Sequence, residues 1–385
     1  MDEALDHVKD LAKCLDEDNR GRLVNELRDL IVSLEPEEDA VQRITFAPLE
    51  VYGARIGVRL RLFHLLASSD SGIHLDRLAK EISPDEILLG RIMRYLASVR
   101  MITELGPDLF AANKMTWTLA SPKGESYINT YYELILPVMA KLPPFLERTG
   151  YDNPTDSLNL PLHDAFGCKG DLFAFLKAHP EKCAMFHNHM HFQRNQTTNW
   201  AKLVTVLRSK GTATDEVLFV DVGGGTGHQS QRVLQYDPDI PGRFILQDLP
   251  QVMESAPTIP GVEKMYYNIF EEQPVIGAKF YYFRGVLHDF PDRSCHSILQ
   301  NTAKAMRSDS TLLLDEMVLP NSGINWMATA MDLQMMANVG AQERTRGAWA
   351  KLLESANLEL VDVQYHGLDP YQALIVAVKQ GEGRV

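Results

Sequence analysis

A glycine-rich run directly after a strand-like apolar segment has the pattern of a nucleotide-binding loop. Residues 217–222 read VLFVDV and the chain continues as GGGTG, whose alternate glycines are Gly223, Gly225 and Gly227. Glycines allow a tight strand-to-helix turn and let a ligand lie against bare backbone. His228 stands where a dinucleotide fingerprint has its third glycine, and Asp221 lies within the strand. The pattern therefore favours S-adenosylmethionine over a nicotinamide dinucleotide as cofactor.

One carboxylate ends the next strand-like segment, RFILQ. Asp248 lies about twenty residues beyond the glycine loop, where a carboxylate can accept hydrogen bonds from both ribose hydroxyls of a nucleotide. Either type of nucleotide would use this contact. The alternative is that Asp248 only caps the helix that follows Leu249 and Pro250.

A histidine follows the fourth predicted strand, KFYYF. His288 of VLHDF lies at the carboxyl end of that strand, where open sheets place their ligand crevice. A histidine at this edge can act as a general base, whereas the alternative is an ordinary histidine that ends a strand. Asp289 and Asp292 are interpreted as caps of the helix that begins near Pro291.

Strand-like and helical segments alternate through the second half of the chain. Continuous apolar strands separated by helices predict a doubly wound, mainly parallel α/β sheet covered on both faces. The last two strands are joined by GLDP at residues 367–370, so we expect an antiparallel end of the sheet. The seven predicted strands read VLFVDV, RFILQ, EKMYY, KFYYF, TLLLDEMVL, LELVDVQYH and ALIVAV.

The first half of the chain repeats Leu, Ile and Val at helical spacing. Residues 51–121 read as three helices and two short extended pieces, which is the order of a winged helix. Winged helices can bind DNA through a basic helix, but Glu81, Asp85 and Glu86 dilute the basic residues here. We expect a helical dimerisation domain at 1–121, a helical connector lining the substrate pocket at 122–210 and a cofactor-binding domain at 211–385.

The composition indicates a globular protein without a polyanionic partner. The 385 residues are 45% hydrophobic and carry a net charge of −13, which disfavours binding to nucleic acid or to an anionic membrane. No uncharged stretch reaches membrane-spanning length. The four cysteines are scattered without a CxxC pair, which favours a reducing, cytoplasmic location. We predict no metal site, because His187, His189 and His191 lack a supporting carboxylate pattern.

Five ordered motifs carry a family resemblance: VDVGGGTG, LQDLPQV, RGVLHDFPD, LLLDEMVLP and MANVGAQERT. The chain resembles the plant and fungal metal-independent O-methyltransferases, and within them the fungal natural-product branch. VYGARIGVRLRLFHLLA and LGRIMRYLASV also resemble that family's N-terminal dimerisation domain. The resemblance implies a Rossmann-like, seven-stranded methyltransferase domain behind a mainly α-helical winged-helix domain, in a homodimer that uses S-adenosylmethionine.

The resemblance also assigns roles to individual residues. It implies a catalytic base at His288, flanked by Glu316 and Glu343. An aspartate is common in the family where this chain has Asn268, which weakens that adenine-side contact. The further cofactor contacts are Asp221, Gly223, Gly225, Gly227, Asp248, Asn268, Ile269 and Arg284, and the substrate-facing residues are Met185, Met335 and Asn338.

The resemblance implies methylation of a phenolic or enolic hydroxyl on an aromatic, polyketide-like small molecule, and the chemistry favours the same catalytic residues. A phenol has a pKa of about 10 and imidazole about 6.5, so complete proton transfer would cost roughly 5 kcal/mol without help. A carboxylate beside the imidazole, from Glu316 or Glu343, would supply that help. The main alternative keeps the fold and cofactor but catalyses dehydration or a pericyclic rearrangement. A non-catalytic or DNA-binding winged-helix protein is a third and less favoured interpretation.

Overall fold

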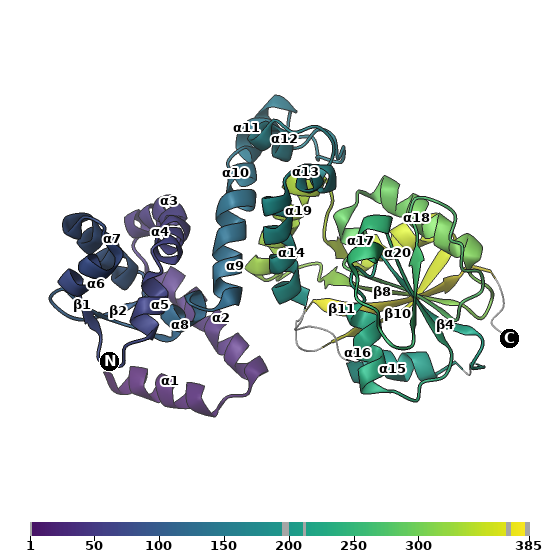
Figure 1. Cartoon of the computed structure of the whole chain (residues 1–385), viewed down its shortest axis with the longest axis horizontal. Helices are drawn as coiled ribbons and strands as arrows, with labels where there is room; N and C mark the ends of the chain where they lie inside the picture. Colours follow the sequence, from purple (N-terminus) through teal and green to yellow (C-terminus); the bar gives the residue numbers. More distant parts are fainter. Residues whose placement is uncertain (1, 195–199, 211–212, 367–370, 382–385) are drawn as a thin grey trace. The chain divides into compact units, whose positions relative to one another are not determined.

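The computed structural model describes residues 2–194, 200–210, 213–366 and 371–381 (Figure 1). The chain divides into two compact units, Met1–Tyr132 and Glu133–Val385. Residues 122–132 of the predicted connector belong to the first unit, and the remainder belongs to the second. The roles assigned to the three predicted segments stay a prediction.

The first unit is mainly helical. Its three short strands, β1 (Ile73–His74), β2 (Thr103–Gly106) and β3 (Leu109–Ala111), form an antiparallel sheet in the order β1-β3-β2. Its helices are α1 (Asp2–Cys14), α2 (Glu17–Leu34), α3 (Glu37–Phe46), α4 (Pro48–Arg59), α5 (Leu62–Ala67), α6 (Leu75–Ile82), α7 (Glu86–Ser98), α8 (Lys114–Leu119) and α9 (Pro122–Thr130).

Side-chain caps and an apolar core fix these short elements. Asp85 accepts a hydrogen bond from the backbone N–H of Leu88 and so begins α7. The core lies between α4–α8 and the sheet and includes Leu62, Phe63 and Phe110, all at most 1% exposed. By contrast, α1 and α3 contain no buried residue.

The second unit begins with helices and continues into a large sheet. A π-helical turn at Tyr131–Ile135 leads into the helices, and α19 packs with α10 and α12. The helices of this part are α10 (Leu136–Met139), α11 (Leu142–Arg148), α12 (Pro161–Phe166), α13 (Leu172–Ala178), α14 (Pro180–Arg194) and α15 (Trp200–Arg208).

The sheet has the strand order β10-β11-β8-β7-β4-β5-β6, with β9 pairing with the end of β8. The neighbouring strands β6, β5, β4, β7 and β8 run parallel to one another. Strand β11 is antiparallel to both β8 and β10, which gives the predicted antiparallel end of the sheet. The turn predicted at 367–370 lies outside the described residues. The strands are β4 (Val217–Val222), β5 (Arg243–Asp248), β6 (Val262–Tyr266), β7 (Phe280–Arg284), β8 (Thr311–Leu319), β9 (Arg344–Thr345), β10 (Leu358–Tyr365) and β11 (Gln372–Lys379).

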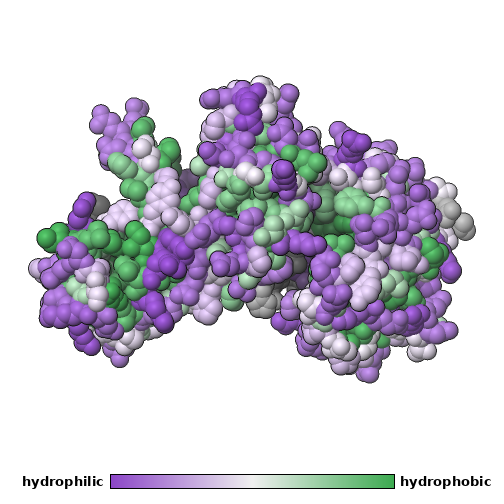
Figure 2. Space-filling view, turned by 45° about the horizontal axis from the view of Figure 1, so that its top comes forward, coloured by the Kyte–Doolittle hydropathy of each residue, from purple (hydrophilic) through white to green (hydrophobic). Residues whose placement is uncertain are grey.

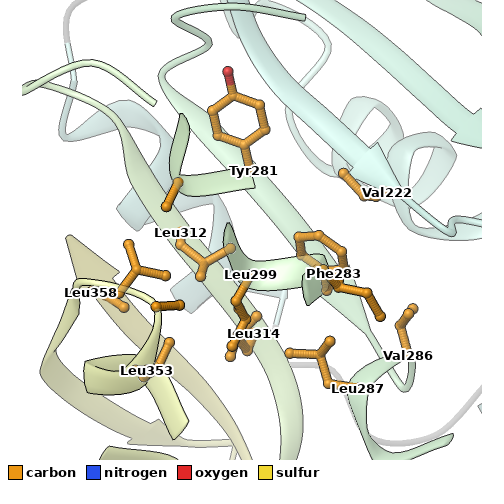
Figure 3. Packing of buried hydrophobic residues seen from close by; sticks show 14 of the residues in the cluster. Val222, Tyr281, Phe283, Val286, Leu287, Leu299, Leu312, Leu314, Leu353 and Leu358 are labelled. Carbon is orange, nitrogen blue, oxygen red and sulfur yellow. The ribbon is translucent and has the colours of Figure 1, made fainter. Parts of the chain in front are cut away.

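Apolar clusters cover both faces of the sheet, which confirms the doubly wound α/β class. One face carries Phe219, Tyr282, Leu313 and Leu374 against α15 and α16. The other face packs against α18 and α20, and there Val286 and Leu287 lie beside Phe283 (Figure 3). The helices that follow the strands are α16 (His228–Tyr236), α17 (Pro250–Ser255), the 3-10 turn η2 (Leu287–Asp289), α18 (Asp292–Ala305), α19 (Trp326–Val339) and α20 (Arg346–Ser355).

The strand order reverses between β4 and β7. From β4 the chain proceeds through β5 and β6 on one side and then crosses over to β7 and β8 on the other. A crevice for a ligand is expected beyond the carboxyl ends of the strands at such a switch point. Among the described residues, no helix has the length and apolar character needed to cross a membrane.

Candidate active site

The glycine loop after β4 has a backbone that side chains would obstruct. Gly223, Gly225 and Gly227 have φ values of +67°, +61° and +83°, which favour glycine. Gly224 has no such φ, but a Cβ atom there would lie 2.5 Å from Leu246 Cδ1 and 2.6 Å from Asp221 Cγ. The loop therefore presents bare backbone at the switch point, as a cradle for a nucleoside requires.

Asp221 is a buried carboxylate directly below this loop. Its Oδ2 accepts hydrogen bonds from the Ser230 hydroxyl (2.7 Å) and backbone N–H (3.3 Å). Its Oδ1 is buried without a hydrogen-bond partner in the described part of the chain. Burial raises the pKa of Asp221 to about 6, although the Ser230 hydrogen bonds oppose this. An orphaned carboxylate oxygen beside the loop fits the amino group of S-adenosylmethionine.

Asp248 organises the loop from the end of β5. Its Oδ2 accepts from the backbone N–H of Gly225 at 2.8 Å, and its Oδ1 accepts from Leu249 N–H at 2.7 Å. Helix α17 has Leu249 at its N-cap and no side-chain cap hydrogen bond. The capping alternative is therefore wrong, and Asp248 lies against the glycine loop as a ribose-binding acid would.

Asn268 and Ile269 follow β6 and form part of a local turn. The Asn268 side chain accepts from Phe270 N–H (3.2 Å) and donates to Glu271 (3.3 Å). Ile269 packs against the sheet core. Their contact with an adenine ring stays a prediction, since the Asn268 amide already has partners within the turn.

Arg284 ends β7 within a buried polar network. Its Nε lies 3.3 Å from Asp315 Oδ2, which also accepts a hydrogen bond from the Tyr282 hydroxyl at 2.7 Å. His366 Nε2 lies 2.9 Å from Asp315 Oδ1. Burial raises the pKa of Asp315, but His366 and Arg284 outweigh it and hold this pKa below its usual value. The sequence pointed to Arg284 but not to these three partners.

His288 lies in η2 between two carboxylates. Its Nδ1 is 3.0 Å from Glu343 Oε1, and its Nε2 is 3.6 Å from Asp289 Oδ1. The imidazole is 26% exposed, whereas the Glu343 side chain is only 1% exposed. Helix α19 ends at Val339 and is capped by Gly340 with φ +68°, and the chain then turns and brings Glu343 against the imidazole. The predicted pairing of histidine and glutamate is thus formed.

Glu316 contacts the backbone that precedes His288 and does not contact the imidazole ring. It is 1% exposed, and its Oε1 accepts hydrogen bonds from the backbone N–H groups of Val286 (3.0 Å) and Leu287 (2.9 Å). Burial raises the pKa of Glu316 to about 7, while the charge of His288 opposes this rise. The two glutamates are therefore buried groups with separate tasks, and neither is a solvated surface acid.

The carboxylates change the basicity of His288. Burial lowers its pKa, but the charges of Asp289, Glu343 and Glu316 and the Glu343 hydrogen bond outweigh burial and raise the pKa to about 10. A phenol also has a pKa of about 10. Transfer of a proton from a phenol to the neutral form of this imidazole therefore loses most of the cost of roughly 5 kcal/mol expected for an ordinary imidazole.

The two acids interpreted as helix caps have other partners, so that interpretation is wrong. The N-cap of α18 is Pro291, without a side-chain hydrogen bond. Asp292 pairs with Arg344 (2.8 Å), and Asp289 faces His288. Asp289 is thus a site residue that the sequence interpretation missed, although its position next to His288 was a usable signal.

The predicted substrate-facing residues lie on two helices of the second unit. Met335 and Asn338 belong to α19, which packs beside η2, and Asn338 donates to Gln334 O at 2.9 Å. Met335 joins the apolar cluster of α10–α14, whereas Met185 on α14 is half-buried outside that cluster. The side chain of His191 lies outside the described residues, and the described residues contain no metal-binding group of three ligands.

We expect Gly224→Ala to destabilise the protein by about 1–3 kcal/mol, because the new methyl group overpacks the space beside Leu246 and Asp221. Gly347→Ala is the matched control. Gly347 lies in the first turn of α20 without a positive φ, and a Cβ atom added there would lie 4.0 Å from its nearest neighbouring atom. Denaturant unfolding should show a loss only for Gly224→Ala, and equal behaviour would contradict the close packing of the loop.

A doubly wound sheet with a glycine cradle at its switch point, and a histidine–carboxylate pair beyond the end of the neighbouring strand β7, indicates an enzyme that uses a nucleoside cofactor. Residues 152–359 match the O-methyltransferase domain family. The chain belongs to this family of S-adenosylmethionine-dependent enzymes.

Individual relatives agree with this family. O-methyltransferase ucdC of Aspergillus ustus is 53% identical, with 98% of this chain and 100% of the relative covered. Demethylsterigmatocystin 6-O-methyltransferase of Aspergillus parasiticus is 35% identical, with 94% of each covered. The LepI complex with SAM and a structure described as a pericyclic reaction enzyme are both 34% identical over 98% of each chain, with TM-scores of 0.90 and 0.89.

Proposed function

We propose that this O-methyltransferase methylates a phenolic or enolic hydroxyl of an aromatic, polyketide-like fungal metabolite, with His288 as general base. The observation that carries the proposal is the His288–Glu343 pair at the carboxyl edge of the sheet, near the glycine cradle. Support for the substrate class comes from the relative named for demethylsterigmatocystin.

The residues divide the work between cofactor binding and proton removal. S-adenosylmethionine supplies an electrophilic methyl group on its sulfonium. Asp248 would hold the ribose hydroxyls, Asp221 the amino group and Arg284 the carboxylate of the cofactor. His288 accepts the hydroxyl proton at Nε2, while Glu343 at Nδ1 fixes the ring and stabilises the imidazolium. Glu316 keeps the Val286–Leu287 backbone, and hence His288, in place.

Mass spectrometry with labelled S-adenosylmethionine and a panel of phenols tests this function. A product heavier by one methyl group, formed together with S-adenosylhomocysteine, is the expected result. The second candidate is dehydration or pericyclic rearrangement, favoured by the likeness to the pericyclic reaction enzyme. Turnover of the natural substrate without methyl gain or cofactor consumption would establish that candidate and overturn methyl transfer.

The proposal includes a homodimer formed through the first unit. The order of elements from α5 to β3, which is helix, strand, helix, helix and a pair of strands, supports a winged helix in this unit. Hydrophobic surface gathers on this unit (Figure 2). Large exposed apolar patches are typical of interfaces between proteins. Seven apolar residues of α2 and α3 are at least 51% exposed: Leu30, Ile31, Val32, Leu34, Val41, Ile44 and Phe46.

We expect the full chain to sediment as a dimer, and deletion of residues 1–50 to give monomers or aggregates because the paired apolar surface is lost. Ile87→Glu is the control for a single exposed apolar residue elsewhere in the unit, since Ile87 is 77% exposed on α7. A full-length monomer, or a stable and fully active monomer after the deletion, would contradict the dimer.

A cytoplasmic location and the absence of nucleic acid and membrane partners also stay proposals. They are supported by four cysteines without disulfides and by the net charge of −13. Secretion of the native protein into an oxidising compartment would contradict the location.

A further inference from the structure

Three acidic side chains from three segments lie at His288, two of them beside the imidazole and one against the backbone that precedes it. Asp289 of η2 faces Nε2 at 3.6 Å, and Glu343 before β9 contacts Nδ1 at 3.0 Å. Glu316 of β8 binds the backbone beside the ring and adds a third acidic group. Such a cluster favours a cation at its centre.

The neighbouring charges do not neutralise this cluster. Arg344 directs its guanidinium to Asp292 (2.8 Å) and to the main-chain oxygens of Leu287 (3.2 Å) and Phe290 (3.0 Å). On α19, Asp332 accepts from the Glu343 backbone N–H at 2.7 Å and is a further acid beside the cluster. Glu343 Oε2 is buried without a hydrogen-bond partner among the described residues. The balancing charge at the centre is therefore the proton on His288.

This arrangement creates a conflict for a general base. With a pKa of about 10, His288 is an imidazolium at neutral pH in the ligand-free protein. An imidazolium has no free lone pair and cannot accept the proton of a hydroxyl group. A nearby positive charge that lowers the pKa of the ring would therefore favour proton removal.

We propose that the carboxylate cluster of Asp289, Glu316 and Glu343 responds to the charge of the cofactor, so that His288 releases its proton when the S-adenosylmethionine sulfonium binds but not when uncharged S-adenosylhomocysteine thioether binds. The inference rests on the proposed function, because that function places the sulfonium near the base. The positive charge of the sulfonium near the ring disfavours the imidazolium, and the proton of His288 leaves to solvent.

The expected displacement is large enough to measure. A unit cation roughly 6 Å from the ring lowers a pKa by about two at an effective dielectric constant of about 20. The pKa of His288 would then fall from about 10 to roughly 8. Between these values, near pH 9, most of the molecules should release a proton on binding S-adenosylmethionine, whereas few should do so at pH 7.

Calorimetry in two buffers of different ionisation enthalpy counts the protons released on binding. At about pH 9, S-adenosylmethionine should release roughly 0.8 proton more than S-adenosylhomocysteine. The ligand amino groups also titrate in this range, so the decisive quantity is the part of the difference that disappears in His288→Gln. His296→Gln is the matched control, because His296 lies on α18 and bonds Ser355 at 2.9 Å.

The outcomes separate this inference from the proposed function. Equal proton release for the two ligands, or a difference that survives in His288→Gln, would overturn the inference while methyl transfer still stands. Failure of the wild-type protein to bind either ligand would overturn the proposed function and this inference with it. Asp289→Asn removes one of the charges that raise the pKa of His288. The pH at which proton release is greatest should therefore be lower in this variant.

Discussion

Replacing His288 with Gln should reduce methyl transfer about 10²- to 10⁴-fold, the usual contribution of general acid–base catalysis. Glutamine keeps a polar side chain of similar reach but has no titratable nitrogen. Affinity for S-adenosylhomocysteine, which has no sulfonium charge, should change little, because the cofactor contacts we propose come from other residues. Steady-state rates and calorimetric dissociation constants measured on the same preparations check both halves of this expectation.

The dependence on acceptor acidity tests the role of His288 as a base. The loss should shrink for a phenol that is already ionised at the assay pH, since no proton then has to be removed. His296→Gln, a change at a half-buried residue of α18 outside the site, should leave the rates unchanged. A His288→Gln protein that slows acidic and weakly acidic phenols equally would indicate that the residue only positions the substrate.

Wild-type activity should rise with pH through the pKa of His288, because only the neutral imidazole accepts a proton. The raised pKa of His288 places this limb of the profile above neutral pH, and bound cofactor should move it downward. His288→Gln should lose this limb. A profile limited near the ordinary imidazole value would contradict the acidic environment described for the ring.

Local patterns predicted the elements that position the site. Short stretches of sequence are enough to predict strands β4, β5 and β7, which are apolar runs, and the turn after β4, which is rich in glycine. The structure has these elements close to where the sequence placed them. Parallel strands then bring Asp221, Asp248 and His288 to the same edge of the sheet without further information. This part of the site follows from periodicity and connection rules.

Partners remote in sequence escaped prediction. Asp292 resembles a helix cap locally, but it pairs with Arg344, which lies 52 residues further along the chain. Asp315 and Glu316 are adjacent on β8, where successive side chains point to opposite faces. Asp315 therefore joins Arg284 and His366, while Glu316 reaches the His288 loop. The adjacent residues Asp315 and Glu316 do not by themselves reveal which face of the sheet each side chain occupies or which residue it contacts.

Removing the carboxylate of Asp248 should weaken cofactor binding. Hydrogen bonds to a charged group contribute about 1.5–3 kcal/mol, so Asp248→Ala should raise the S-adenosylhomocysteine dissociation constant roughly 10- to 150-fold. Part of this loss comes from the Gly225 N–H, which Asp248 holds at 2.8 Å. Asp248→Asn can retain that contact through its amide oxygen, so it should lie between the wild type and Asp248→Ala.

Asp362→Ala is the matched control for this change. Asp362 Oδ1 accepts from the following backbone N–H of Val363 at 2.8 Å, as Asp248 Oδ1 does from Leu249 at 2.7 Å, but it belongs to β10. Its removal should leave the dissociation constant unchanged. A folded Asp248→Ala protein that binds the cofactor as tightly as the wild type would remove Asp248 from the cofactor site. The glycine loop and Asp221 would then have to account for nucleoside binding.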